Sequence, residues 1–162
     1  MKPLGVILNP AANRGKAKAV GAKVFQYFAE AGIPVVNLSG ETALAATEKA
    51  NIMIRSQDLS GIVAIGGDGT SQLGMNLAVP NQLPLGLIPA GSGNDQVREL
   101  GISLTDTKAA VDNIIASLDE PRRVDAMKVS VSGREFWSLG SISAGFDALC
   151  ATRANSLKWP KG

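Results

Sequence analysis

One stretch of the sequence decides the fold: Gly61-Ile62-Val63-Ala64-Ile65-Gly66-Gly67-Asp68-Gly69-Thr70. Its first half, Gly61 to Ile65, is a short apolar run, which is typical of a strand buried on both faces. Its second half places three glycines around one aspartate and leads into residues 70–79, whose pattern predicts a helix. A strand, a glycine-rich turn and a helix in this order indicate a phosphate-binding turn in a parallel α/β sheet.

The same turn also has a purely structural interpretation. Asp68 or Thr70 can cap the helix that follows, and glycine with aspartate is common where a strand leads into a helix. Three glycines around a single acid favour the functional interpretation. In that interpretation, backbone N–H groups bind phosphate oxygens and Asp68 reaches Mg²⁺ or its water shell.

The alternation of strand and helix continues along the chain. Strands are expected at residues 4–8, 34–38, 61–65 and 85–88, and helices at residues 16–31, 42–55, 70–79 and 105–118. This order predicts a three-layer α/β domain, a parallel sheet with helices on both faces. Two strands then follow at 124–131 and 135–142, joined across Ser132-Gly133 as a hairpin. We therefore expect a nucleotide-binding domain over residues 1–122 and the incomplete beginning of a β-rich domain over residues 123–162.

A second glycine-rich turn, Pro89-Ala90-Gly91-Ser92-Gly93-Asn94-Asp95, follows the strand at 85–88. The carboxyl ends of parallel strands meet at one edge of the sheet, so this turn is expected to face the first one across a cleft. Its glycines free the backbone, and its polar side chains supply donors and acceptors for phosphate, ribose or a metal-bound water. The structural alternative is an irregular connection in which Asn94 or Asp95 caps a short helix.

The turn after the first strand, Asn9-Pro10-Ala11-Ala12-Asn13-Arg14-Gly15-Lys16, is a third candidate. Arg14 and Lys16 can neutralise phosphate charge, and Gly15 permits close approach at the start of a helix. By itself this pattern is more typical of a solvated surface. A functional role for this turn is favoured only in combination with the other two turns.

Composition excludes several classes of function. The chain has 162 residues, a net charge of +2, no histidine and a single cysteine, Cys150, so an internal disulfide and the usual zinc and iron ligand sets cannot form. Histidine-dependent hydrolases lose their base, and neither the Gly-x-x-x-x-Gly-Lys-Ser/Thr loop nor the Gly-x-Gly-x-x-Gly fingerprint occurs. Basic residues form no long run, so no nucleic-acid partner is expected. Residues 71–94 lack charge, but polar residues and prolines interrupt them, which predicts no transmembrane segment and a soluble, cytoplasmic protein.

The three turns together resemble the diacylglycerol kinase catalytic domain family, which includes bacterial lipid kinases and sphingosine kinases. The resemblance continues through Arg123-Val124-Asp125, Ser143-Ala144-Gly145-Phe146-Asp147-Ala148 and Arg153-Ala154-Asn155. It implies an enzyme that uses Mg²⁺ and transfers the γ-phosphoryl group of ATP to a lipid hydroxyl, with a diacylglycerol-like substrate at the inner membrane surface. By position it implies these nucleotide-binding residues: Asn9, Arg14, Gly66, Gly67, Asp68, Gly69, Thr70, Gly91, Ser92, Gly93, Asn94 and Asp95.

Asp68 is the catalytic candidate that the resemblance implies, and its expected role is to organise Mg²⁺ through water. The chain departs from the family in two respects. Many relatives carry an Asn-Glu pair where this chain has Gln72-Leu73. Family members are also about twice this length, as two domains of ordinary size require. The lipid pocket, a general base and further metal ligands are therefore expected outside these residues, and this chain alone is expected to be inactive.

Two other hypotheses remain open. NAD kinases share the Gly-Gly-Asp-Gly-Thr turn, although residues 89–95 argue against that assignment. The chain can also be a catalytically inactive nucleotide-binding or oligomerising module, because an incomplete second domain leaves strands unpaired and favours homo-oligomers. The aromatic residues beyond residue 122 are interpreted as the interior of that domain: Phe136, Trp137, Phe146 and Trp159.

Overall fold

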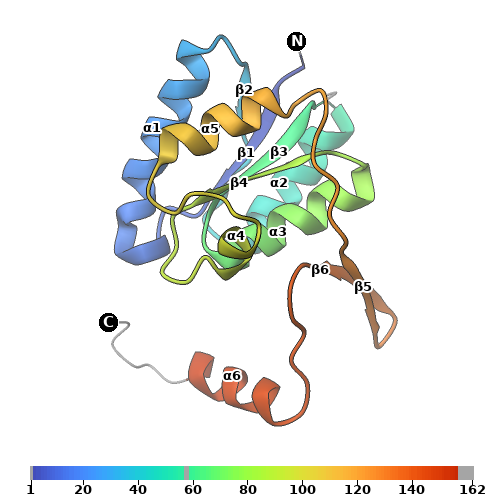
Figure 1. Cartoon of the computed structure of the whole chain (residues 1–162). Helices are drawn as coiled ribbons and strands as arrows, with labels where there is room; N and C mark the ends of the chain where they lie inside the picture. The colour runs from blue at the N-terminus through green and yellow to red at the C-terminus, as the bar shows by residue number, and fades with distance from the viewer. Residues whose placement is uncertain (1, 57–58, 157–162) are drawn as a thin grey trace.

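The computed structural model describes residues 2–56 and 59–156, and Figure 1 shows an α/β body followed by a hairpin and a separate helix. The body contains one four-stranded parallel sheet with the order β2-β1-β3-β4. Its strands are β1 Leu4–Leu8, β2 Val35–Asn37, β3 Gly61–Gly66 and β4 Leu85–Pro89. Its helices are η1 Ala12–Gly15, α1 Lys16–Glu30, α2 Ala43–Ser56, α3 Asp68–Ala78, η2 Val79–Asn81, α4 Asp95–Glu99 and α5 Thr107–Ala116. The predicted α/β class with a parallel sheet is confirmed.

Helices cover both faces of the sheet, because successive side chains of each strand point to opposite sides. Leu4 and Val6 of β1 pack into one core with Phe28 of α1 and Val111 of α5. Ile7, the residue after Val6 on the same strand, belongs to the opposite core, which α2 and α3 complete. Figure 1 shows α1 and α5 on one side of the sheet and α2 and α3 on the other. The three layers hold the strand ends in fixed positions.

Two helices begin two residues away from the expected positions, while α2 begins one residue later than expected. Helix α3 begins at Asp68 instead of Thr70, because the Gly67 carbonyl already accepts from the Thr70 and Ser71 amides, at 2.9 and 3.0 Å. Helix α5 begins at Thr107 instead of residue 105, because the Asp106 carboxylate accepts from the backbone amide three residues later at 2.9 Å. The first difference places Asp68 in the first turn of a helix.

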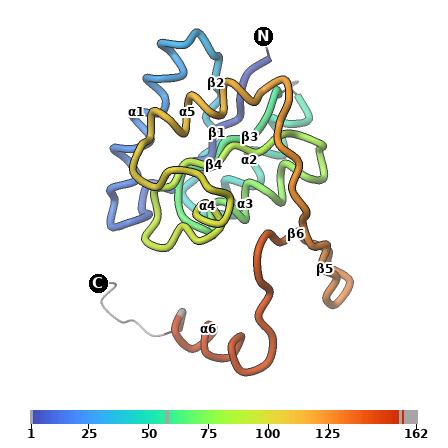
Figure 2. The backbone as a smooth tube through the Cα atoms, in the orientation of Figure 1, coloured from blue at the N-terminus to red at the C-terminus, as the bar shows by residue number. Residues whose placement is uncertain are grey.

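Beyond the body, β5 (Met127–Val131) and β6 (Arg134–Ser138) form an antiparallel hairpin. Ser132 and Gly133 both have positive φ, 50° and 74°, which is the backbone of a tight two-residue hairpin turn. The hairpin is where the sequence predicted it, but both strands are shorter than expected. Figure 2 traces the chain from α5 through the hairpin to α6 (Phe146–Ser156), a helix that the strand pattern did not predict.

The aromatic residues after residue 122 do not form an interior within the described part of the chain. Phe146 is 78% exposed and Phe136 is 38% exposed, while Trp137 is half-buried. Their interpretation as the interior of a complete second domain stays a prediction, and Trp159 lies outside the described residues. Between residues 2 and 156, leaving out 57 and 58, no helix combines the length and the apolar character that a bilayer crossing requires.

Candidate functional site

A cavity of about 630 Å³ lies at the carboxyl edge of the sheet, and the loops that follow all four strands line it. The chain leaves β1 towards one side of the sheet and β3 towards the other, so the cavity sits where the strand order reverses. Ligands of open α/β sheets bind at this switch point. The polar and glycine residues that line the cavity are Asn9, Asn13, Gly40, Glu41, Thr42, Gly67, Asp68, Gly69, Thr70, Gly91, Ser92 and Gly93.

The two glycine-rich turns touch each other through their backbones. A Cβ atom on Gly91 would lie 2.3 Å from the Gly67 Cα atom, which is closer than any side chain permits. The Ala90 amide donates to the Gly66 carbonyl at 2.8 Å and joins the two strand ends just before this contact. The turns that the sequence predicted to face each other are therefore neighbours, and glycine is required where they meet.

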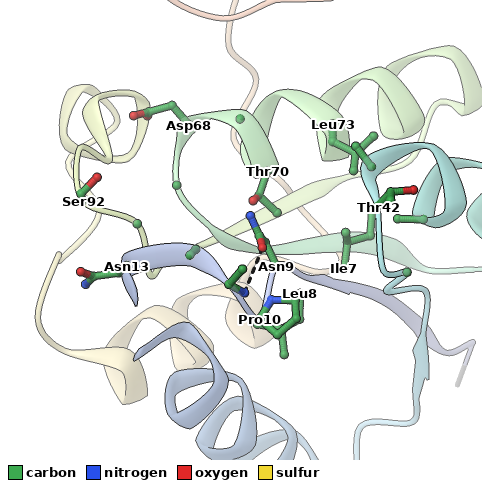
Figure 3. Close-up of a pocket in the computed structure, with 18 of the residues that line it drawn as sticks. Ile7, Leu8, Asn9, Pro10, Asn13, Thr42, Asp68, Thr70, Leu73 and Ser92 are labelled. Carbon is green, nitrogen blue, oxygen red and sulfur yellow. Dashed lines mark hydrogen bonds between the residues drawn. The ribbon is translucent and has the colours of Figure 1, made fainter. Parts of the chain in front are cut away.

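Asp68 is half-buried, and its carboxylate joins the two turns. Its Oδ1 atom accepts from the Gln96 backbone amide at 3.0 Å. Its Oδ2 atom lies 3.0 Å from the position that a Cβ atom on Gly93 would take. Figure 3 shows Asp68 on the side of the cavity near Ser92, away from Asn9 and Thr70. Asp68 thus caps α4 and also lines the cavity. From the sequence, Asp68 was a possible cap only of the helix that directly follows it.

Asn94 supports the second glycine-rich turn through its side chain and does not line the cavity. Its backbone is left-handed, with φ of 62°, and its side chain is only 8% exposed. The side-chain amide pairs with Gly91, because Oδ1 accepts from the Gly91 amide and Nδ2 donates to the Gly91 carbonyl, both at 3.0 Å. Asp95 forms an ion pair with Arg98 within α4 and also stays outside the lining. Asn94 therefore shapes the turn directly, and Asp95 is linked to the turn through Arg98, which also donates to the Gly93 carbonyl at 3.2 Å.

The turn after β1 contributes Asn9 to the cavity and leaves Arg14 outside it. The Asn9 backbone amide donates to the Ile65 carbonyl at 3.1 Å, and its side-chain oxygen accepts from the Ala11 amide at 3.1 Å. Asn9 is thereby fixed between β1 and β3. Arg14 is exposed on η1 with a left-handed φ of 56°, which is uncommon for a residue with a long side chain. Gly66, the remaining predicted residue, is buried at the end of β3.

Sequence reasoning missed the loop after β2, which forms one wall of the cavity with Gly40, Glu41 and Thr42. The Leu8 amide donates to the Ser39 hydroxyl at 2.9 Å and ties this loop to β1. Thr42 caps α2, since its hydroxyl accepts from the backbone amide three residues later at 3.1 Å. The available signal was position, because this loop follows a predicted strand at the same edge of the sheet.

The charge of the cavity favours a bound cation. Two carboxylates, Glu41 and Asp68, lie among its lining residues, and no lysine or arginine does. Within residues 2–56 and 59–156, no cluster of three or more His, Cys, Asp or Glu side chains forms a complete metal cage. Mg²⁺ needs no such cage, because it binds one or two carboxylates and completes its shell with water and phosphate oxygens. The carboxylate of Asp68 and the hydroxyl of Ser92 on the same side of the cavity fit that requirement.

Comparison with known proteins identifies relatives along most of the chain. The model of the diacylglycerol kinase catalytic domain matches residues 3–129. A diacylglycerol kinase from Mycobacterium tuberculosis (strain ATCC 25618 / H37Rv) is 30% identical over 158 residues, which are 96% of this chain and 50% of that protein. A diacylglycerol kinase from Bacillus subtilis (strain 168) is 37% identical over 127 residues, 75% of this chain and 40% of the other. The chain thus spans about half the length of these curated relatives.

Solved structures agree with the sequence relatives. A crystal structure of a diacylglycerol kinase from Bacillus anthracis str. Sterne superposes with a TM-score of 0.56 at 27% identity. The superposition covers 68% of this chain and 42% of that protein.

Proposed function

The chain belongs to the diacylglycerol kinase catalytic domain family, and from this premise we propose that its glycine-turn cavity binds Mg²⁺-ATP for transfer of the γ-phosphoryl group to a lipid hydroxyl. The observation that carries the proposal is the backbone contact of Gly67 with Gly91 at the switch point of the sheet. Two turns without side chains at their contact let a polyphosphate approach the backbone closely.

The start of α3 supplies donors for this ligand. The first N–H groups of a helix have no acceptor within the helix, and the helix dipole adds positive potential at the same end. In α3 the Thr70 and Ser71 amides bind the Gly67 carbonyl, which leaves the Asp68 and Gly69 amides at the cavity for phosphate oxygens. The hydroxyls of Thr70 and Ser92 can add donors from opposite sides.

Asp68 is the residue we propose for holding the metal, through one of its bound waters. The carboxylate keeps acceptor capacity beyond its bond to Gln96, because an ionised carboxylate has about four acceptor positions. When bound, Mg²⁺ would offset the charge of the phosphates and of the transferring group. A cavity with two acidic residues and no basic residue among those lining it would otherwise repel a polyphosphate. Asn9 and Asn13 border the same space and complete the proposed nucleotide site.

The acceptor is proposed to be a diacylglycerol-like lipid, reached at the cytoplasmic face of a membrane. We also propose that residues 1–122 hold the nucleotide and that residues from 123 begin the part of the enzyme that carries the lipid. Because the relatives are about twice as long, phosphoryl transfer is expected to need that further part, so this chain alone binds Mg²⁺-ATP without turnover. An NAD kinase-like enzyme and an inactive or oligomerising nucleotide module are the alternatives.

Transfer assays with two acceptors test this proposal. The purified chain is incubated with Mg²⁺ and γ-labelled ATP, with diacylglycerol in mixed micelles in one reaction and NAD in the other. We expect Mg²⁺-ATP to raise the thermal unfolding midpoint and neither acceptor to be labelled. Labelled NAD would overturn the lipid-kinase assignment, and labelled diacylglycerol would establish it while disproving the need for further residues. A midpoint that Mg²⁺-ATP leaves unchanged would contradict nucleotide binding.

A further inference from the structure

Amide side chains, more than apolar packing, attach the β5-β6 hairpin to the α/β body. Both strands are largely exposed, and in β6 only Ser138 is fully buried. Three side chains donate to backbone carbonyls of the segment: Gln72 and Asn76 of α3 to Trp137, and Gln96 of α4 to Leu139 at 3.2 Å. We call Gln72, Asn76 and Gln96 the amide joint.

Asn76 binds β6 as a neighbouring strand would. Its Nδ2 atom donates to the Trp137 carbonyl at 2.9 Å, and its Oδ1 atom accepts from the Trp137 amide at 2.8 Å. Gln72 lies one helical turn earlier, so both side chains point from the same face of α3. The helix that starts at the glycine turn therefore holds the edge of β6 by paired hydrogen bonds.

Gln96 connects the joint to Asp68. Its backbone amide donates to the Asp68 carboxylate at 3.0 Å, while its own side chain donates to the Leu139 carbonyl. A continuous series of polar contacts thus runs from the cavity, through Asp68 and Gln96, to the residue that follows β6. Any ligand that fixes or draws away the Asp68 carboxylate acts on the same residue that holds the hairpin.

We infer that the amide joint couples the occupancy of the glycine-turn cavity to the position of the β5-β6 hairpin. The inference rests on the proposed function for the identity of the ligand. The hydrogen bonds that carry the coupling are present without ligand, so the coupling can be tested in the ligand-free protein. Gln72, Asn76 and Gln96 are then positioning residues, since all three bind the hairpin backbone, Gln96 alone also binds Asp68, and none of them lines the cavity. By linkage, a ligand that stabilises the joint binds more tightly when the joint is intact.

Amide hydrogen exchange of two backbone groups, residue 96 and residue 137, measures the joint directly by NMR. Asn76→Ala is expected to accelerate exchange at residue 137 about tenfold, as the loss of its acceptor implies. Asn81→Ala is the matched control. Asn76 donates to the Gln72 carbonyl at 2.9 Å, and Asn81 likewise donates to a carbonyl four residues earlier, at 2.7 Å, but it forms no hydrogen bond to β6 within the described residues. Exchange at residue 137 should remain within about twofold of wild type in that control.

The ligand-free test of coupling is a double-mutant cycle. Asp68→Ala should accelerate exchange at both residue 96 and residue 137, and Asp68→Asn, which keeps an acceptor oxygen, should restore both rates. In the Gln96→Ala background, which keeps the backbone amide and removes the bond to Leu139, Asp68→Ala should no longer affect residue 137. Acceleration at residue 96 alone in Asp68→Ala, or an equal effect in both backgrounds, would overturn the inference.

The ligand test uses Mg²⁺-ATP on the same proteins, with calorimetry to establish binding. Saturating Mg²⁺-ATP should slow exchange at residues 96 and 137, and Gln96→Ala should remove the effect at residue 137 only. Binding that leaves residue 137 unchanged in the wild-type chain would overturn the coupling. If calorimetry detects no binding, the proposed function fails, and the ligand-free cycle alone decides the inference.

Discussion

Gly91→Ala tests whether the two glycine turns meet through their backbones. The added Cβ atom would lie 2.3 Å from the Gly67 Cα atom and 2.8 Å from the Gly67 nitrogen, while ordinary contacts begin near 3.4 Å. The turns would have to separate by about 1 Å, and both contacting atoms are backbone. That movement strains the hydrogen bond from Ala90 to Gly66. Overpacking and a weakened hydrogen bond together cost about 3 kcal/mol.

For a chain of this size, such a loss lowers the unfolding midpoint by about 6–12 °C. Thermal unfolding followed by circular dichroism measures the shift, and Gly69→Ala is the control on the same turn. A Cβ atom on Gly69 meets no heavy atom within 4 Å, and the residue lies in the first turn of α3, so its midpoint should stay the same or rise. A Gly91→Ala midpoint within about 1 °C of wild type would refute the reasoning.

Three further predictions concern single interactions. Asn94→Ala removes both hydrogen bonds to Gly91 and should lower the free energy of unfolding by about 2 kcal/mol, measured by urea titration. An unchanged urea midpoint would show that the turn keeps its shape without these bonds. Asp106→Ala removes the cap of α5 and should lower the free energy of unfolding by about 1 kcal/mol in the same titration. Asp106→Asn should lower it by less than half of that. Equal losses of stability in the two variants would argue against capping. The hydrogen bond to Asp112 raises the pKa of Lys108 above 10.5, so the pair stabilises the fold below that pH and loses its effect as the pH rises through the raised value. NMR titration of Lys108 should show the pKa return towards 10.5 in Asp112→Asn, and an unchanged pKa would contradict the assigned cause.

The sequence was sufficient to predict the parallel sheet, because each strand is an apolar run and each connection carries helical periodicity. The run from Gly61 to Ile65 is buried at every position, as a strand covered on both faces must be. Helix α4 was harder to predict, since its five residues carry no periodicity and its cap, Asp68, comes from another part of the chain. Helix α6 was missed because its apolar residues follow neither a helical nor a strand period.

The candidate site was predictable where glycine and position coincided. Eight of the predicted residues line the cavity, and they lie in the turns after β1, β3 and β4. Asn94 and Asp95 were assigned to the same surface because the sequence does not reveal which way a side chain points from an irregular turn. The role of Asp68 as the cap of α4 depends on two segments that are distant in sequence, so only the fold could reveal it. The loop after β2 carries no glycine-rich signature and was missed for that reason.

Isothermal titration calorimetry of Mg²⁺-ATP into the purified chain and into Asp68→Ala tests the central claim most directly. We expect saturable binding to the wild-type chain that the substitution weakens about tenfold or more, because the water bound to the metal loses its carboxylate acceptor. Asn81→Ala, remote from the cavity lining, should bind as wild type does. Equal affinity of wild type and Asp68→Ala, or no binding by either, would contradict a nucleotide site at the glycine turns.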